Sequence, residues 1–218
     1  MFGWLYFIID FFLLPSILQS VNIILGKPFS AAVINVLYFA VNFCCTGYIF
    51  RRFLWGSFSA ARQKPAQVLV WTMIMLPVYF VISWFCAQIA YALRADFANL
   101  NDQSIAHLMQ QNYWLMCFGT VLLVPMAEEL LFRGLIFHGL YHKSKYLAYC
   151  VSTFAFAAIH VVSFIGMYDL PLLLLSLLQY LPAGLCLGFA YEKSGTICTP
   201  IIMHIIINLI GVLFLVAH

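Results

Sequence analysis

The chain has 218 residues, of which 65% are hydrophobic and only 8% are charged, and its mean hydropathy is +1.01. A typical soluble domain is about one-quarter charged, so this composition excludes a globular protein in water and indicates an integral membrane protein. The net charge of +3 comes without a long basic run, and we therefore expect the lipid bilayer, and no nucleic acid, as a partner.

Long apolar runs follow one another along the whole chain. A helix needs about 20 apolar residues to cross the hydrocarbon core of a bilayer. Runs of this kind predict an all-α, polytopic helical bundle of about seven transmembrane helices, with six or eight possible, at 4–25, 29–50, 67–93, 113–141, 147–165, 171–191 and 199–217. The runs are continuously apolar rather than alternating, which does not fit the strands of a membrane barrel. We expect residues 1–218 to form a single membrane domain.

The distribution of basic residues predicts the orientation of these spans. With seven spans, one side of the membrane carries the basic residues Arg51, Arg52, Arg62, Lys64, Lys143, Lys145 and Lys193. The other side carries only Lys27 and Arg94. The first side should be cytoplasmic, and the N-terminus with it. The polar connection 94–112 should lie on the far side, as a solvated loop or as an interfacial amphipathic turn.

Ionisable side chains inside the predicted spans are concentrated in the last part of the chain. Each costs roughly 2.5–3.5 kcal/mol on insertion and is a functional-site candidate. Glu129 and Arg133 stand at i and i+4 and can pair on one helix face, whereas Glu128 points about 100° away from Glu129. Glu128 therefore needs a partner from another span, and the candidates are His160 and His204.

Each of these residues has a packing explanation when taken alone. A Glu–Arg pair can hold two helices together, and His204 and Asn208, at i and i+4, can hydrogen-bond between helices. The combination of two carboxylates, an arginine, two histidines and an amide on three spans is more than packing requires. Hydrolysis is the chemistry that it allows, since a buried carboxylate can act as general base on water and N–H groups can stabilise an oxyanion.

A metal ion is an alternative way to activate the water. If a divalent metal such as zinc is present, the candidate ligands are Glu128, His160 and His204. The HExxH pattern of zinc peptidases is absent, and no third firm ligand is evident. The leading hypothesis therefore requires no cofactor, and metal dependence stays open.

Three motifs resemble those of the CAAX prenyl protease and bacteriocin-processing family, the Abi-type (CPBP) intramembrane endopeptidases. The family pattern is E-E-x-x-x-R, then F-x-x-x-H, then H-x-x-x-N. This chain has the first motif at 128–133, the second at 156–160 and the third at 204–208, complete and in order on separate predicted spans. The motif-bearing part is about 125–208.

The resemblance implies a membrane-embedded peptidase of the glutamate type. It implies that Glu128 and His160 activate the attacking water, and that His204 and Asn208 hold the oxyanion. The positions with a supporting role are Glu129, Arg133 and Phe156. Earlier accounts of the family described the motif residues, the catalytic positions included, as metal ligands, which would make the enzyme metalloprotease-like.

The resemblance also implies a substrate class. The substrate would be a membrane-anchored or lipidated peptide or protein, cut either at a CAAX-type site or during maturation of a bacteriocin or other peptide. The short chain, without long extramembrane domains, is similar to bacterial members and suggests the bacterial cell membrane. The alternatives are a proton-coupled transporter and a catalytically idle immunity or scaffold protein of the same fold. A transporter should show two corresponding halves with broken helices, and the sequence shows no such repeat.

The hydrolase hypothesis makes a geometric prediction. Glu128, His160, His204 and Asn208 should converge on one cavity, which should open to the cytoplasmic half or sideways to lipid. The predicted span limits place His204 roughly 10 Å nearer the cytoplasmic edge than Glu128. Convergence therefore requires helices 113–141 and 147–165 to extend beyond that edge.

Overall fold

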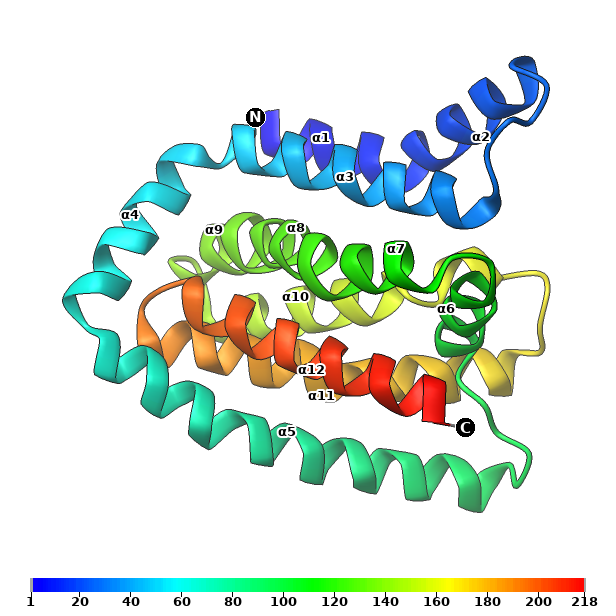
Figure 1. Cartoon of the computed structure of the whole chain (residues 1–218). Helices are drawn as coiled ribbons and strands as arrows, with labels where there is room; N and C mark the ends of the chain where they lie inside the picture. The colour runs from blue at the N-terminus through cyan, green and yellow to red at the C-terminus, as the bar shows by residue number, and fades with distance from the viewer. Residues whose placement is uncertain (1, 218) are drawn as a thin grey trace.

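The computed structural model describes residues 2–217, and apart from one isolated bridge between Ile165 and Tyr168 every regular element in this range is helical. The predicted all-α polytopic class is confirmed. The long apolar helices that could cross a membrane are α3 (Ala31–Ile49), α5 (Pro65–Leu93), the continuous helix Tyr113–Tyr141, α11 (Leu170–Ser194) and α12 (Cys198–Ala217). Helices α1 (Phe2–Phe12) and α2 (Leu14–Ile24) meet at a bend of 50° and count as a sixth span if the bent pair is taken as one. Figure 1 shows these helices side by side in one bundle.

The fifth predicted span, 147–165, is shorter than the sequence suggests. Its helix, α10, runs from Lys145 to Ile159, and only 15 residues are too few for an ordinary crossing. Ser144 caps the start by accepting a hydrogen bond from the Leu147 amide, and the chain leaves the helix at His160. The number of membrane-length spans is therefore five or six rather than seven, although α10 still carries the chain from one end of the bundle to the other (Figure 1).

Two segments that the sequence places in loops are helices. The connection 51–66 contains α4 (Arg51–Gln63), and the connection 94–112 contains α6 (Leu100–Gln111). The side chain of Asn99 caps α6 by accepting hydrogen bonds from two backbone amides. The sequence did not predict α4, because polar residues interrupt the apolar pattern that identified the spans, whereas α6 agrees with the amphipathic alternative for 94–112 rather than with the solvated loop.

The two ends of the bundle differ in composition. In Figure 1, α4, the turn between α9 (His138–Tyr141) and α10, and the turn between α11 and α12 lie at one end, together with the N-terminus. These elements carry the basic residues that predict the cytoplasmic side. The opposite end holds α6, the segment 160–170 and the C-terminal end of α12.

The helix Tyr113–Tyr141 is not a regular α-helix throughout. It consists of α7 (Tyr113–Phe118), a π-helical turn (Gly119–Leu123), α8 (Val124–Glu129), a second π-helical stretch (Leu130–Phe137) and α9. Wide turns of this kind are rare and often lie at functional sites. Here they flank the segment that carries both glutamates.

Candidate active site

A buried ion pair forms the base of the candidate site. Arg133 donates from Nη1 to Glu129 Oε1 at 2.8 Å, and neither side chain is exposed. The pairing predicted from the i, i+4 spacing is confirmed. Arg133 also donates from Nη2 to the backbone oxygen of Gly184 on α11 at 3.0 Å, and its guanidinium lies 4.7 Å from the centre of the Phe156 ring. These contacts hold α8, α10 and α11 together at one point.

His204 on α12 completes this arrangement. Its Nδ1 lies 2.9 Å from the same oxygen of Glu129 that accepts from Arg133. Since a carboxylate oxygen accepts, Nδ1 carries the proton and Nε2 is left for other partners. Nε2 is 3.8 Å from Glu128 Oε2, too far for a hydrogen bond. The sequence suggested a histidine as partner for Glu128, and His204 lies within ion-pair distance of it while hydrogen-bonding to Glu129.

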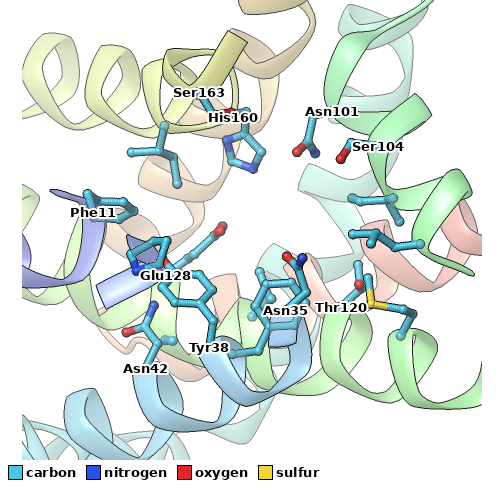
Figure 2. A pocket seen from close by; sticks show the side chains of 18 of the residues that line it. Phe11, Asn35, Tyr38, Asn42, Asn101, Ser104, Thr120, Glu128, His160 and Ser163 are labelled. Carbon is cyan, nitrogen blue, oxygen red and sulfur yellow. The ribbon is translucent and has the colours of Figure 1, made fainter. Parts of the chain in front are cut away.

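Glu128, the neighbour of Glu129 in the chain, has a carboxylate oxygen without a hydrogen-bond partner among the described residues. Its Oε2 atom is buried and accepts no hydrogen bond from any residue that the structure describes. Figure 2 shows its side chain directed into the open space beneath His160, with Asn101 and Ser104 on the other side. A buried carboxylate oxygen normally has a hydrogen-bond partner, so Glu128 is placed to take one from a molecule in this space.

His160 is held in place from two directions. It follows the last residue of α10, and its Nδ1 lies 2.8 Å from the backbone oxygen of Phe156, which can only accept. The ring stacks on Tyr180 of α11 with centroids 4.0 Å apart and planes 16° apart. The Nε2 atom therefore keeps its lone pair available.

Asn208 lies one helical turn after His204 and contacts the π-helical turn of the neighbouring helix. Its Nδ2 donates to the backbone oxygen of Thr120 at 2.9 Å. That oxygen is free because the Val124 amide bonds to Gly119 in the wide turn and Pro125 has no N–H to offer. The second N–H of the Asn208 amide remains available.

Glu128, His160, His204 and Asn208 line one cavity of about 500 Å³, as the hydrolase hypothesis requires. Glu129 and Arg133 are not among its lining residues. The 10 Å offset in depth expected from the predicted span limits is therefore absent, since residues of α8, α10 and α12 meet here.

The cavity extends toward α6. Its lining continues to Asn101, Asp102 and Ser104 of α6, and Asp102 is exposed. Figure 1 places α6 at the end of the bundle away from α4 and the basic residues, so the cavity extends toward that end. This end of the cavity lies away from the basic end, because the connection 94–112 folds over the site as a helix, and the predicted opening sideways to lipid stays a prediction.

Sequence motifs did not identify a polar network around Tyr180. Its hydroxyl lies 3.1 Å from both Asn99 Oδ1 and Asp102 Oδ1, and it accepts from Asn101 Nδ2 at 3.0 Å. This network links α6 to the ring on which His160 stacks. The only signal in the sequence was the polarity of 94–112.

A second network lies behind the cavity wall. Asp10 is fully buried in α1 and accepts from Asn42 Nδ2 at 3.0 Å, while Tyr6 donates to the same amide at 3.2 Å. Asn42 and Tyr38 of α3 line the cavity. Asp10 is the one charged residue in the apolar run 4–25, but its partner Asn42 lies on another helix and shares no motif with it.

The described residues do not form a metal site. Within 2–217, no three His, Cys, Asp or Glu side chains are grouped closely enough to hold an ion. Both histidines of the proposed ligand set already use Nδ1, for Glu129 and for the Phe156 carbonyl. Each ring thus has only Nε2 left as a possible metal ligand, since a ligating histidine commonly donates its other N–H to a carboxylate or carbonyl oxygen.

The fold and the site together define an integral membrane protein with a polar cavity enclosed by its helices. Residues 110–210 match the family described as "Type II CAAX prenyl endopeptidase Rce1-like". This segment contains all three motifs, and the match confirms the resemblance to the CAAX prenyl protease and bacteriocin-processing family.

Among curated proteins, the chain is similar to the "Putative membrane peptidase YdiL" of Bacillus subtilis (strain 168). The two are 31% identical over 109 residues, which is 50% of this chain and 40% of the relative. The match thus covers less than half of the relative's length. No solved structure matches the chain.

Proposed function

We propose that this protein is an intramembrane endopeptidase that hydrolyses a peptide bond in a membrane-anchored peptide or protein. One observation carries the proposal. The buried Oε2 atom of Glu128 has no hydrogen-bond partner, and Glu128 lines a cavity of about 500 Å³ together with two histidines and an asparagine amide. The family match and the name of the Bacillus subtilis relative point to the same class of reaction.

In the proposed mechanism, Glu128 takes a proton from a water molecule that His160 Nε2 orients. The water oxygen attacks the peptide carbonyl carbon, and the carbonyl electrons move to the oxygen. His204 Nε2–H and the free N–H of Asn208 donate to that oxyanion. Collapse of the intermediate breaks the C–N bond, and the proton on Glu128 passes to the leaving amine.

The supporting residues would prepare the oxyanion donors. Glu129 accepts from His204 Nδ1 and so fixes the orientation of the ring, and an imidazole protonated on both nitrogens would present Nε2–H to the oxyanion. Arg133 and Phe156 hold Glu129 and His160 in position. No metal is required in this proposal.

The substrate would be of the CAAX type or of the bacteriocin and peptide-maturation type. We further propose that the protein resides in a bacterial cell membrane with its N-terminus in the cytoplasm, on the basis of the basic residues gathered at one end. The transporter alternative predicts proton flux into proteoliposomes, and the idle scaffold predicts neither flux nor cleavage.

The test compares membrane peptides from cells that express the wild-type protein with those from cells that express Glu128→Gln. Glu192→Gln is the matched control, because Glu192 is bonded to Lys145 at the basic end, outside the cavity. New peptide termini that appear with wild type and Glu192→Gln, and disappear with Glu128→Gln, support the peptidase. Identical termini in all three strains would contradict it.

A further inference from the structure

A second groove lies away from the carboxylate cavity, between α4, α5 and α12. Its volume is about 640 Å³, within the range of about 300–1,000 Å³ that is typical of sites for small ligands, and it shares no lining residue with the first cavity. Apolar side chains form its walls: Trp55 and Phe58 of α4, Leu69 of α5 and Ile202 of α12. All four are exposed, so the groove is open to the surroundings of the protein.

The α4 side of this groove is amphipathic. Trp55, Phe58 and Arg62 are spaced at i, i+3 and i+7, so they share one helix face, and all three line the groove. Arg62 lies in the last turn of α4, where its stem can lie along apolar surface while its guanidinium stays in a polar layer. This combination of aromatic and basic side chains is typical of a helix at the membrane interface.

Arg62 is the one charged residue among those that line the groove, and the helix segment that carries it is basic. The segment 51–64 contains four basic residues and no acidic residue. Clusters of this size on an amphipathic helix beside a membrane span attract anionic lipid headgroups. Glu192, an acidic residue at the same end of the bundle, is already bonded to Lys145 at 2.6 Å.

The groove also contains an unpaired polar atom at its base. Thr72 of α5 is only 5% exposed, and its hydroxyl has no hydrogen-bond partner among the described residues. A buried hydroxyl needs an acceptor. A purely hydrocarbon occupant would not supply one, whereas the ester carbonyl of a glycerolipid would.

We propose that this groove binds one anionic phospholipid. An acyl chain lies against Trp55, Phe58 and Leu69, the Thr72 hydroxyl donates to an ester carbonyl, and Arg62 pairs with the phosphate. The site is separate from the candidate active site, so its existence does not depend on the peptidase proposal.

The test measures binding of fluorescent phosphatidylglycerol and phosphatidylcholine to the purified full-length chain in a neutral detergent. Wild type should bind the anionic lipid at least tenfold more tightly than the zwitterionic one. Arg62→Gln should lose this preference. Arg52→Gln is the matched control, because Arg52 is exposed on the same helix but does not line the groove. Ser59→Trp, at an exposed lining position, should fill the groove and weaken binding of both lipids.

Three results would overturn the proposal. The first is equal affinity of wild type for the two lipids, which would indicate an apolar groove without headgroup recognition. The second is an equal loss of preference in Arg52→Gln and Arg62→Gln, which would indicate diffuse surface charge. The third is full displacement of the lipid by soluble glycerol phosphate, which would indicate an anion site without an acyl-chain site. Elution volume and thermal unfolding of each variant verify that it is folded.

Discussion

Glu128 and Glu129 are neighbours in the chain but have different surroundings. Glu129 accepts hydrogen bonds from Arg133 and His204 in the interior, whereas Glu128 faces the cavity without a partner. Successive residues of a helix point about 100° apart, so one carboxylate can hold the structure together while the next is free for chemistry. The proposed division of roles follows from this geometry.

This difference predicts opposite consequences for the same substitution. Glu129→Gln should destabilise the fold by about 3–5 kcal/mol, because it leaves the buried Arg133 charge without its partner. Glu128→Gln, the matched control, removes no protein hydrogen bond and should unfold at the wild-type temperature or above. Thermal unfolding of both variants in detergent measures the difference. Equal stability of the two would show that the Glu129–Arg133 pair does not stabilise the fold.

Tyr180 should act as a positioning residue for His160. Tyr180→Leu removes the stacked ring and should lower kcat by about ten- to a hundredfold with little change in KM, since small misplacements of a reacting group are costly. Tyr180→Phe keeps the ring and loses only the hydrogen bonds to α6, so it should restore most of kcat. If leucine and phenylalanine have the same effect, stacking does not position His160.

At the scale of the helices, the motifs predicted which residues converge but not how they pair. The spacing of Glu129 and Arg133 fixes their contact within one helix. The pairing of His204 with Glu129 depends on the rotation and closeness of separate helices, which no spacing in the sequence encodes. The polar helix α4 was missed, and the extent of α6 was not predicted, because hydropathy identifies spans and not interfacial helices.

The closeness of α10 and α11 depends on Gly184. A Cβ atom there would lie 2.9 Å from the Cα atom of Thr153, and the Gly184 carbonyl also accepts from Arg133. Gly184→Ala should therefore destabilise the fold by about 1–3 kcal/mol through overpacking. Gly188→Ala on the same helix is the control, since its Cβ would meet nothing nearer than 3.4 Å. Thermal unfolding that is unchanged in Gly184→Ala would contradict this packing.

At the scale of the whole molecule, the first half of the chain is more than a membrane anchor. Helices α1, α2, α3 and α6 supply much of the cavity wall, although the motifs and the family match lie at 110–210. The sequence predicted the single helical bundle and the gathering of basic residues at one end. It could not predict which end the cavity faces, because that depends on how α6 folds over the site.

The orientation predicts a labelling pattern in intact cells. In a background without the seven native cysteines, Asp96→Cys should react with an impermeant maleimide, and Gln63→Cys should be protected until the cells are permeabilised. The two positions lie at opposite ends of the bundle. Equal labelling of both in intact cells would contradict the proposed topology.

The central claim is that Glu128 activates a water molecule to cleave a peptide bond, and isotope labelling tests it most directly. The purified protein in liposomes would be given its peptide substrate in water enriched in oxygen-18. The account predicts that wild type places one oxygen-18 atom in the new C-terminal carboxylate, and that Glu128→Gln yields no cleaved product while remaining folded. Cleavage by Glu128→Gln at the wild-type rate would contradict it.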